Sequence, residues 1–499
     1  MPDDAQLPVI TDPDIADVDP LVCVVSDLHL GGDPGQSDFF AAAELATLLD
    51  RLTATAGPIE LVLAGDVFEM LQIHETIGSD GSRVRPLMTA RETACIFERL
   101  RRFAAGPAHR VICLVGNHDN QLWWDEGERR VLLEGGYVHE IALSYEHVFG
   151  SDDRGALLYC EHGAEYDPAN AVHDYTNPLS TPLGHHLVVD VVNHLEPLGL
   201  MTSPEGPTSL ADIDNIHPLE MVPWWFVSRF FYRATQQAVK YVVGPGLLLY
   251  VLFHLLPVAL LFERIATGHP RLDRLGDFFS GPPWLLLLFV IFDSSLALGI
   301  VILLLVRRAF RRARRRYGLE DIGTIFGRTE RFWEDVTNEV LLGRRPPALR
   351  DGPWQGCDVF IYGHTHFGFI RPVSDGDRLR AVVNTGTWTR KVLPVRGRLK
   401  LPPVFLPTYE LSYALAYVRE GALMVELWEV PKRLDYSLPW PERLAIVRKE
   451  RPPYEPASLE PHLLDRVAVP LRPLAGDAGT PLTNLQSTGS KGQPVVAGG

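Results

Sequence analysis

The chain has 499 residues, which is long enough for two or three folded domains, and its 46% content of hydrophobic residues is typical of a folded protein. Its formal net charge of −15 argues against a general nucleic-acid-binding protein, whose surface would be basic. Residues 1–20 are acidic and lack the apolar run of a secretory signal peptide. We therefore expect a flexible arm there, followed by a first strand that folds in the cytosol.

Short apolar runs alternate with helical patterns along the first part of the chain. Continuous apolar runs are typical of buried strands, and apolar residues at helical spacing indicate amphipathic helices. The predicted strands are Leu21–Ser26, Ile59–Ala64, Arg110–Val115, Leu157–Cys160 and Val359–Tyr362, and the predicted helices are Asp38–Ala54 and Thr89–Ala105. This alternation predicts a layered α/β core.

Two long apolar runs interrupt the pattern in the middle of the chain. Residues 241–262 contain no charge, and residues 283–306 contain only Asp293. At 1.5 Å per residue, each run could cross a hydrocarbon core of about 30 Å. We therefore predict a transmembrane hairpin, with a pair of buried core helices as the alternative.

The residues around these runs predict their orientation. Arg307–Arg316 contains seven arginines in ten residues, so we expect both ends of the hairpin in the cytosol. This block also suits anionic lipid headgroups, although a topology signal alone would explain it equally well. Before the first run, the mixture of aromatic residues and arginine in Pro223–Arg233 suits a membrane interface, with ordinary core aromatics as the alternative.

Five short polar motifs follow the predicted strands in a fixed order. They are Asp27-Leu-His29, Gly65-Asp66, Gly116-Asn117-His118-Asp119, Glu161-His162-Gly163 and Gly363-His364-Thr-His366. Each motif alone occurs often by chance, but five in succession after buried strands predict one convergent site. Loops at strand ends in layered α/β folds are where ligands collect.

The residue types in these motifs suit a centre of two divalent metal ions. Such a centre needs a bridging ligand and a mixed oxygen and nitrogen shell, and Asp66 is the natural bridge. We expect Asp27, His29 and His366 at one ion, and Asn117, His162 and His364 at the other. Imidazole with carboxylate favours Mn, with Fe or Zn as alternatives, over Ca or Mg.

The expected chemistry is attack on phosphorus by a hydroxide that bridges the two ions. His118 would protonate the leaving oxygen or stabilise the transition state, and Asp119 would orient it. A purely structural pairing of His118 with Asp119 is the alternative.

At these motifs the chain resembles the calcineurin-like metallophosphoesterase superfamily, whose pattern is DxH, GD, GNH[D/E], H and GHxH. The motifs match from Asp27 to His366. The resemblance implies a four-layer α/β structure, in which a β-sandwich is flanked by helices, a binuclear metal centre and phosphoester hydrolysis. An inserted helical region with the two transmembrane helices would be an addition to that fold.

Two motifs are similar to a narrower group, the UDP-2,3-diacylglucosamine pyrophosphate hydrolases, which are membrane-associated and act on a lipid-linked nucleotide. They are SDLHLG at Ser26–Gly31 and GDVFE at Gly65–Glu69. The chain departs from that group at His118, where the group usually has arginine, and at Ala164, where its HGD motif would have aspartate.

These observations give one domain organisation. It consists of a flexible arm (1–20), a metallophosphoesterase domain (21–170 and 351–430), a helical insertion with the hairpin (171–350), a C-terminal extension (431–469) and a disordered tail (470–499). The predicted function is a membrane-anchored hydrolase of a lipid-linked phosphate or pyrophosphate at the cytosolic face. A tethered phosphatase or phosphodiesterase for a soluble nucleotide or phosphoprotein is the alternative, and a membrane protein with a relic site is a third.

Overall fold

The computed structural model describes most of the chain outside the middle of the insertion and the two ends. The described residues are 19–32, 39–73, 77–151, 153–192, 215–245, 322–398, 401–434, 438–446 and 458–473, with single positions at 248, 251, 301, 304, 308, 312 and 456.

The first sheet has seven strands and carries most of the parallel pairing. Its order is β14 (His462–Pro470), β13 (Ala422–Val430), β12 (Leu411–Arg419), β1 (Leu21–Val25), β2 (Ile59–Ala64), β3 (His109–Leu114) and β4 (Glu140–Ala142). Strands β1 to β4 are parallel, whereas β12 pairs with β1 in the antiparallel sense. The carboxyl ends of β1, β2 and β3 therefore meet at one edge of the sheet.

The second sheet contains the strands that precede the last two histidine motifs. Its order is β15 (Arg472–Pro473), β6 (Arg154–Glu161), β7 (Val359–Tyr362), β9 (Arg378–Asn384) and β8 (Phe369–Asp375), with β5 (Ser144–Ser151) paired to β6. Strands β6, β7 and β9 are parallel neighbours. The insertion thus separates two strands, β6 and β7, that are adjacent in space.

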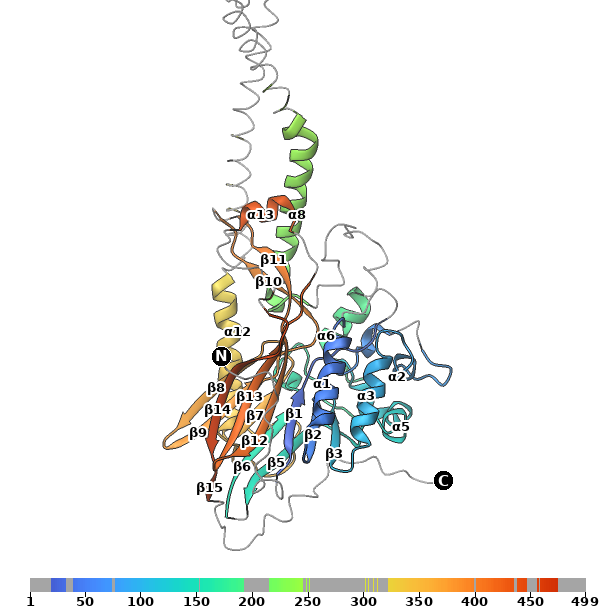
Figure 1. The fold of residues 1–499 in the computed structure, drawn as a ribbon. Helices are drawn as coiled ribbons and strands as arrows, with labels where there is room; N and C mark the ends of the chain where they lie inside the picture. The colour runs from blue at the N-terminus through green and yellow to red at the C-terminus, as the bar shows by residue number, and fades with distance from the viewer. Residues whose placement is uncertain are drawn as a thin grey trace, which may run out of the picture.

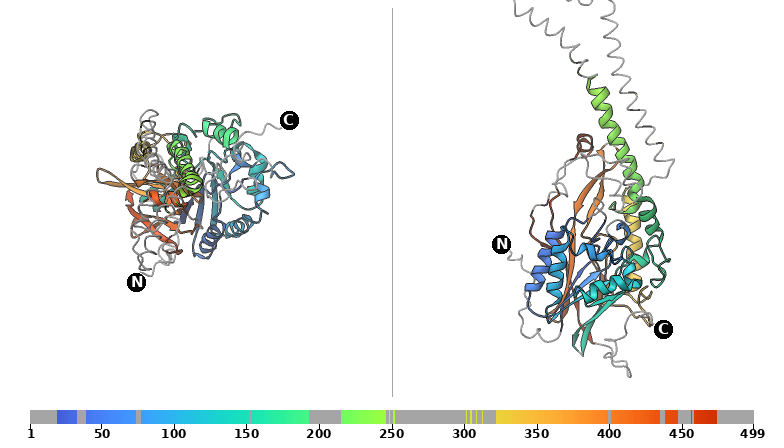
Figure 2. Two further views of the ribbon diagram at one scale, coloured as in Figure 1. Left: turned by 90° about the horizontal axis from the view of Figure 1, so that it is seen from above. Right: turned by 90° about the vertical axis from the view of Figure 1, so that its right-hand side faces the viewer.

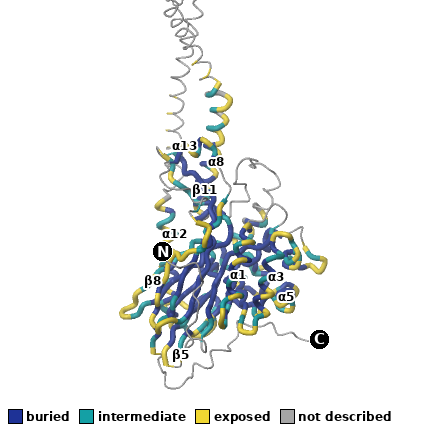
Figure 3. Tube along the Cα trace, viewed as in Figure 1, coloured by how far each residue is buried: buried dark blue, intermediate teal, exposed yellow. Residues whose placement is uncertain are grey.

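The sheets and helices form four layers, which confirms the predicted α/β sandwich (Figure 1). Alternate residues of β1 face opposite ways, so Cys23 packs toward helices α1 (Ala42–Ala54) and α3 (Ala94–Ala104), whereas Val24 packs toward the second sheet. On the far side of the second sheet, Phe360 packs against helix α12 (Ile322–Leu341). The central strands, such as β1, β2 and β7, are accordingly buried along most of their length (Figure 3).

Shorter elements fill the loops of the sandwich. They are η1 (Met70–Gln72), α2 (Val84–Leu87), α4 (Gln121–Trp124), α5 (Glu126–Glu134), η2 (Ala164–Tyr166), α6 (Leu183–His186) and the π-helix η3 (Leu187–Val192).

One described part of the insertion, residues 219–243, rises from one end of the sandwich (Figure 1). Helix α8 (Val222–Ala238) follows the single turn η6 (Leu219–Met221) and continues as the π-helix η7 (Val239–Val243). Its lower part packs on the hairpin of β10 (Arg390–Val395) and β11 (Val404–Tyr409) and on α13 (Trp440–Ala445). Figure 2 shows α8 extending away from the sandwich beyond these contacts.

The aromatic segment before the first apolar run is divided between two environments. Trp224 and Trp225 are buried in a cluster with Val392 and Phe405, as the core-aromatic alternative predicted. Phe226 and Phe230 of the same helix are exposed. The segment therefore anchors α8 to the β10–β11 hairpin with one face and presents aromatic rings on the other.

Most of the two predicted transmembrane runs, 241–262 and 283–306, lies outside the described residues, as does most of Arg307–Arg316. Within the part of the chain that the structure describes, no helix combines the length and the apolarity needed to cross a membrane.

The sandwich extends past the predicted domain boundary at residue 430. Strand β14 pairs along β13, and β15 pairs with β6 in the other sheet, so residues 462–473 belong to the sandwich and the predicted tail cannot begin at 470. A side chain of this segment, Arg472, also pairs with the buried Asp358. Strand β14 was not predicted because its first five residues are exposed, and the segment therefore lacks a continuous apolar pattern.

Candidate metal centre

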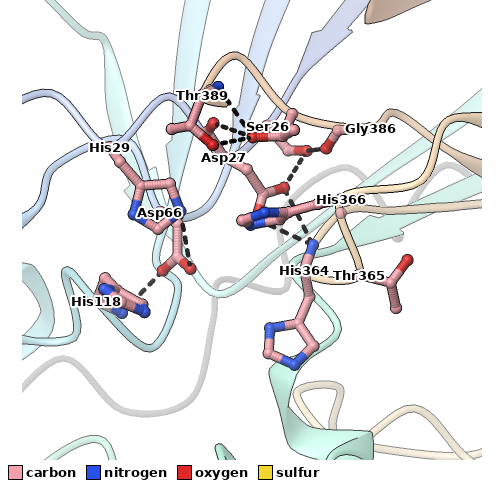
Figure 4. Close-up of polar contacts among 12 residues, drawn as sticks. Ser26, Asp27, His29, Asp66, His118, His364, Thr365, His366, Gly386 and Thr389 are labelled. Atoms are coloured by element: carbon pink, nitrogen blue, oxygen red, sulfur yellow. Dashed lines mark hydrogen bonds and ion pairs between the residues drawn. The ribbon is translucent and has the colours of Figure 1, made fainter. Parts of the chain in front are cut away.

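The five motifs converge at the carboxyl ends of the parallel strands. Asp27 and His29 follow β1, Asp66 follows β2, and Asn117 follows β3, while the second sheet brings the histidines that follow β6 and β7. In Figure 4, His29, Asp66 and His118 lie opposite Asp27, His364 and His366. All seven predicted ligands therefore reach one region, although the last motif lies beyond the whole insertion.

The backbone is strained at five of these residues. Asp27, His29, Asp66, His364 and His366 have positive φ angles of 53°, 47°, 49°, 61° and 62°. Each non-glycine residue in such a conformation costs on the order of 1–3 kcal/mol and persists only where its surroundings enforce it. The backbone strain is thus concentrated at residues that were predicted to bind metal.

The first group of potential ligand atoms belongs to Asp27, His29 and His366, and these atoms lie within 4.8 Å of one another. His366 Nε2 is 3.1 Å from Asp27 Oδ1. His29 Nε2 is buried without a hydrogen-bond partner and is 3.9 Å from Asp66 Oδ2. A buried nitrogen in that state is costly, and a cation between it and the carboxylates would satisfy it.

The second group belongs to Asp66, His162 and His364. His162 Nε2 is 3.1 Å from both Asp66 Oδ2 and Asn117 Oδ1. Its Nδ1 is 3.1 Å from the carbonyl oxygen of Ala64, where it must donate. A neutral ring then presents a lone pair at Nε2 toward two oxygens, an arrangement that requires a cation or an added proton. The donor set therefore fits a metal ion.

Asp66 is a buried carboxylate with histidines on two sides. Burial alone would raise the pKa of its carboxyl, but the imidazoles of His162 and His118 hold that pKa well below its ordinary value. Asp66 Oδ2 faces His162 and His29, and Oδ1 accepts a hydrogen bond from the backbone N–H of His118 at 2.8 Å. The carboxylate thus lies between the two groups, as a bridging ligand must.

Each of the four predicted metal-binding histidines has one ring nitrogen held by a neighbour, and in His29, His162 and His366 the other nitrogen faces a carboxylate of the site. The held pairs are His29 Nδ1 with Glu69 Oε2 (2.8 Å), His162 Nδ1 with Ala64 O (3.1 Å), His364 Nε2 with Asp167 Oδ2 (3.1 Å) and His366 Nδ1 with His217 Nε2 (2.9 Å). Such outer partners fix the tautomer and orientation of metal-binding histidines.

The carboxylate that holds the His118 ring is Glu69, not Asp119 as the sequence suggested. Glu69 Oε2 is 2.7 Å from His118 Nδ1 and also contacts His29. Burial opposes ionisation of Glu69, but the two histidines lower its pKa to about 2. Asp119 instead accepts hydrogen bonds from the backbone N–H groups of Val67 and Gly116, both at 2.7 Å. Asp119 therefore joins the loops after β2 and β3.

Glycines beside the ligands are required chiefly for space. A Cβ atom on Gly116 would lie 2.2 Å from Asp66 Oδ1, and one on Gly363 would lie 2.3 Å from Asp27 Oδ2. Gly65 combines a positive φ with a Cβ position 2.5 Å from the ring of His162. The motif glycines thus allow the carboxylates and the imidazole to lie directly against neighbouring backbone.

Sequence reasoning missed three residues that contact the predicted ligands: Glu69, Asp167 and His217. Glu69 lies inside the GDVFE motif, so its position was a usable signal. Asp167 and His217 lie outside every motif and reach His364 and His366 through folding of the chain. The sequence contained no pattern that pointed to these two.

Comparison with known proteins agrees with this geometry. Residues 20–219 match the model of a family described as calcineurin-like phosphoesterase. That family consists of metal-dependent phosphoester hydrolases, and with the convergent site this identifies the chain as a metal-dependent phosphoesterase. The narrower resemblance to the UDP-2,3-diacylglucosamine pyrophosphate hydrolases finds no support in the match.

Other comparisons add little. No curated protein matches the chain. Among solved structures, a single mutant of Vps29 from Entamoeba histolytica aligns with 10% identity and a TM-score of 0.24, covering 90% of this chain and 98% of that one.

We predict that Gly116→Ala reduces bound metal, because the added methyl group displaces Asp66. The measurement is metal content by elemental analysis after dialysis against dilute Mn²⁺. Gly327→Ala is the matched control, since a Cβ there meets no atom within 4 Å. Full metal content in Gly116→Ala would show that Asp66 does not need this space.

We predict that Glu69→Gln lowers turnover about 10–100-fold, because the substitution weakens the partner of two histidines. The measurement is release of phosphate from a simple monoester in the presence of Mn²⁺. Undiminished turnover in Glu69→Gln would refute this role of the carboxylate.

Proposed function

We propose that the chain is a binuclear-metal phosphoester hydrolase that acts on a lipid-linked phosphate or pyrophosphate at the cytosolic face of a membrane. The observation that carries the hydrolytic part is the convergence of the Asp66 carboxylate with His162 on one side and His29 on the other. A single carboxylate directed at two histidine groups is the arrangement that two adjacent metal ions need.

The proposal assigns seven residues to the metals. Asp27, His29 and His366 would hold one ion, Asn117, His162 and His364 the other, and Asp66 both. The donor set favours two Mn ions, with Fe or Zn as alternatives. When bound, such ions lower the pKa of water toward neutrality and offset negative charge on phosphoryl oxygens.

His118 is assigned to the proton transfer. Its side chain is 16% exposed, against 9% or less for His29 and His162. His118 is therefore the most accessible to a substrate of these three histidines. Glu69 accepts from Nδ1 and keeps the ring fixed. We assign Nε2 to protonation of the leaving oxygen, which a positioned imidazole does efficiently near neutral pH.

The insertion supports a substrate that approaches from its side. His217, just before α8, contacts His366, and Trp333 of α12 lies with its ring centroid 5.8 Å from that of His364. The segment just before α8 and helix α12, both parts of the insertion, therefore contact the two histidines of the last motif. A substrate delivered along α8 would arrive beside the metal ligands.

The outer face of α8 supports the membrane part of the proposal. Exposed residues recur at a spacing of three or four along α8 and into η7, at Pro223, Phe226, Phe230, Arg233, Gln237 and Tyr241, and Ala234 and Lys240 beside them are exposed as well. This stripe of aromatic, basic and polar side chains is the composition expected at a lipid headgroup boundary. The apolar runs 241–262 and 283–306 follow it in the sequence and would supply the membrane anchor.

A substrate panel tests the enzymatic proposal. Purified protein with Mn²⁺ is offered phospholipids, nucleotide-diphospho lipids, simple monoesters, simple diesters and soluble nucleotides, with release of phosphate or nucleotide as the readout. We expect the highest kcat/KM on a lipid-linked compound, and no turnover by Asp66→Asn. Exclusive activity on soluble nucleotides would exclude the lipid substrate and favour a tethered soluble-substrate enzyme.

A separate prediction concerns the face of α8. Phe230→Ser should weaken activity on vesicle-embedded substrate and spare activity on a soluble monoester, because Phe230 is 78% exposed on the outer face of α8. Phe40→Ser, at a Phe that is 53% exposed beside α1, is the control. An equal effect of the two substitutions would argue against a lipid-facing role for α8.

A further inference from the structure

His217 is held beside the metal ligands by a short strand-like pairing. Residues 215–217 lie along β10, with Ile216 bridged to Val392. Val392 N donates to Asn215 O at 2.8 Å, and His217 N donates to Val392 O at 3.3 Å. The pairing places the His217 ring, which is buried, with Nε2 2.9 Å from His366 Nδ1.

The hydrogen bond between these rings has only one polarity that is compatible with metal binding. His366 Nε2 lies 3.1 Å from Asp27 Oδ1, so Nε2 is the nitrogen directed at the metal group. A metal-binding Nε2 carries no proton, and the proton of the neutral ring is then on Nδ1. His366 Nδ1 must donate, and His217 Nε2 must accept with its lone pair.

His217 is a nitrogen acceptor, whereas the partners of His29, His162 and His364 accept through oxygen atoms of a carboxylate or a carbonyl group. The same loop is held at a second point by Lys391, whose buried Nζ donates to the carbonyl oxygen of His366 at 3.0 Å. His366 is therefore fixed at its ring by residues 215–217 and at its backbone by β10, which pair with each other.

We propose that His217 is a positioning residue for the Asp27–His29–His366 metal site, and that the segment leading into α8 thereby becomes part of the metal centre. His217 holds His366 in the metal-binding tautomer and orientation. Without it, Nδ1 of a buried histidine would lose its acceptor, and the ring could rotate or change tautomer. The inference rests on the metal centre of the proposed function but not on the identity of the substrate.

The test compares substitutions of His217 in the full-length protein. His217→Phe keeps a ring but has no acceptor, and His217→Gln keeps an acceptor oxygen. Co²⁺ binding is followed by competition with a chromophoric chelator and by visible absorption, and unfolding in urea reports stability. His462→Phe, at an exposed histidine of β14, is the control, and Asp167→Asn should weaken the other metal site through His364.

We expect His217→Phe to lose about 10–100-fold in affinity in one of two Co²⁺ binding steps, as is usual for an outer partner of a ligand. His217→Gln should lie closer to the unsubstituted protein, and Asp167→Asn should affect the other step. The inference is overturned if His217→Phe binds both ions normally, if Phe and Gln lose equal affinity, or if both steps weaken together. Absence of Co²⁺ binding by the unsubstituted protein would instead contradict the proposed metal centre.

A measurement on the unsubstituted protein covers the case in which the variants do not fold. Two-bond ¹⁵N–¹H correlation of ¹⁵N-histidine-labelled protein loaded with Zn²⁺ reports which ring nitrogens carry protons. We expect a protonated Nδ1 at His366 and an unprotonated Nε2 at His217. A proton on Nε2 of His217 would overturn the inference.

Discussion

The position of the Asp66 carboxylate is the constraint on which the rest of the site depends. One oxygen is held by the backbone N–H of His118, and the other lies 3.1 Å from His162 Nε2. Gly116 leaves the space that this carboxylate fills, and Asp119 ties together the two loops that approach it. A displacement of Asp66 would separate both groups of histidines from the carboxylate that they share. The contacts of the surrounding loops hold Asp66 in this position.

Much of this site could be predicted from the sequence because its ligands follow buried strands. The parallel strands β1, β2 and β3 are mostly apolar, and their carboxyl ends must lie together. The residue types at those ends then indicate metal chemistry. Strand β14 and the division of Trp225 from Phe226 could not be predicted, because both depend on which face of an element finds a neighbour.

The outer partners of the ligands were less predictable than the ligands themselves. Asp119 is adjacent to His118 in the sequence, yet Glu69 reaches the ring from the loop after β2. Adjacent residues in a tight loop point in different directions, whereas residues on neighbouring loops can face each other. His217 is an extreme case, because only its pairing with β10 brings it to His366.

The separation of β6 from β7 by the insertion has a consequence for biosynthesis. His162 is translated before the insertion, and His364 and His366 are translated after it, so the metal centre cannot assemble on a nascent chain until the insertion has left the ribosome. Strand β1 also waits for β12, and β6 waits for β15 near residue 472. Pairings this distant in sequence form late and leave strand edges exposed meanwhile. If the insertion reaches its final position in the cell during translation, that step therefore comes before the metal centre forms and before the enzyme becomes active.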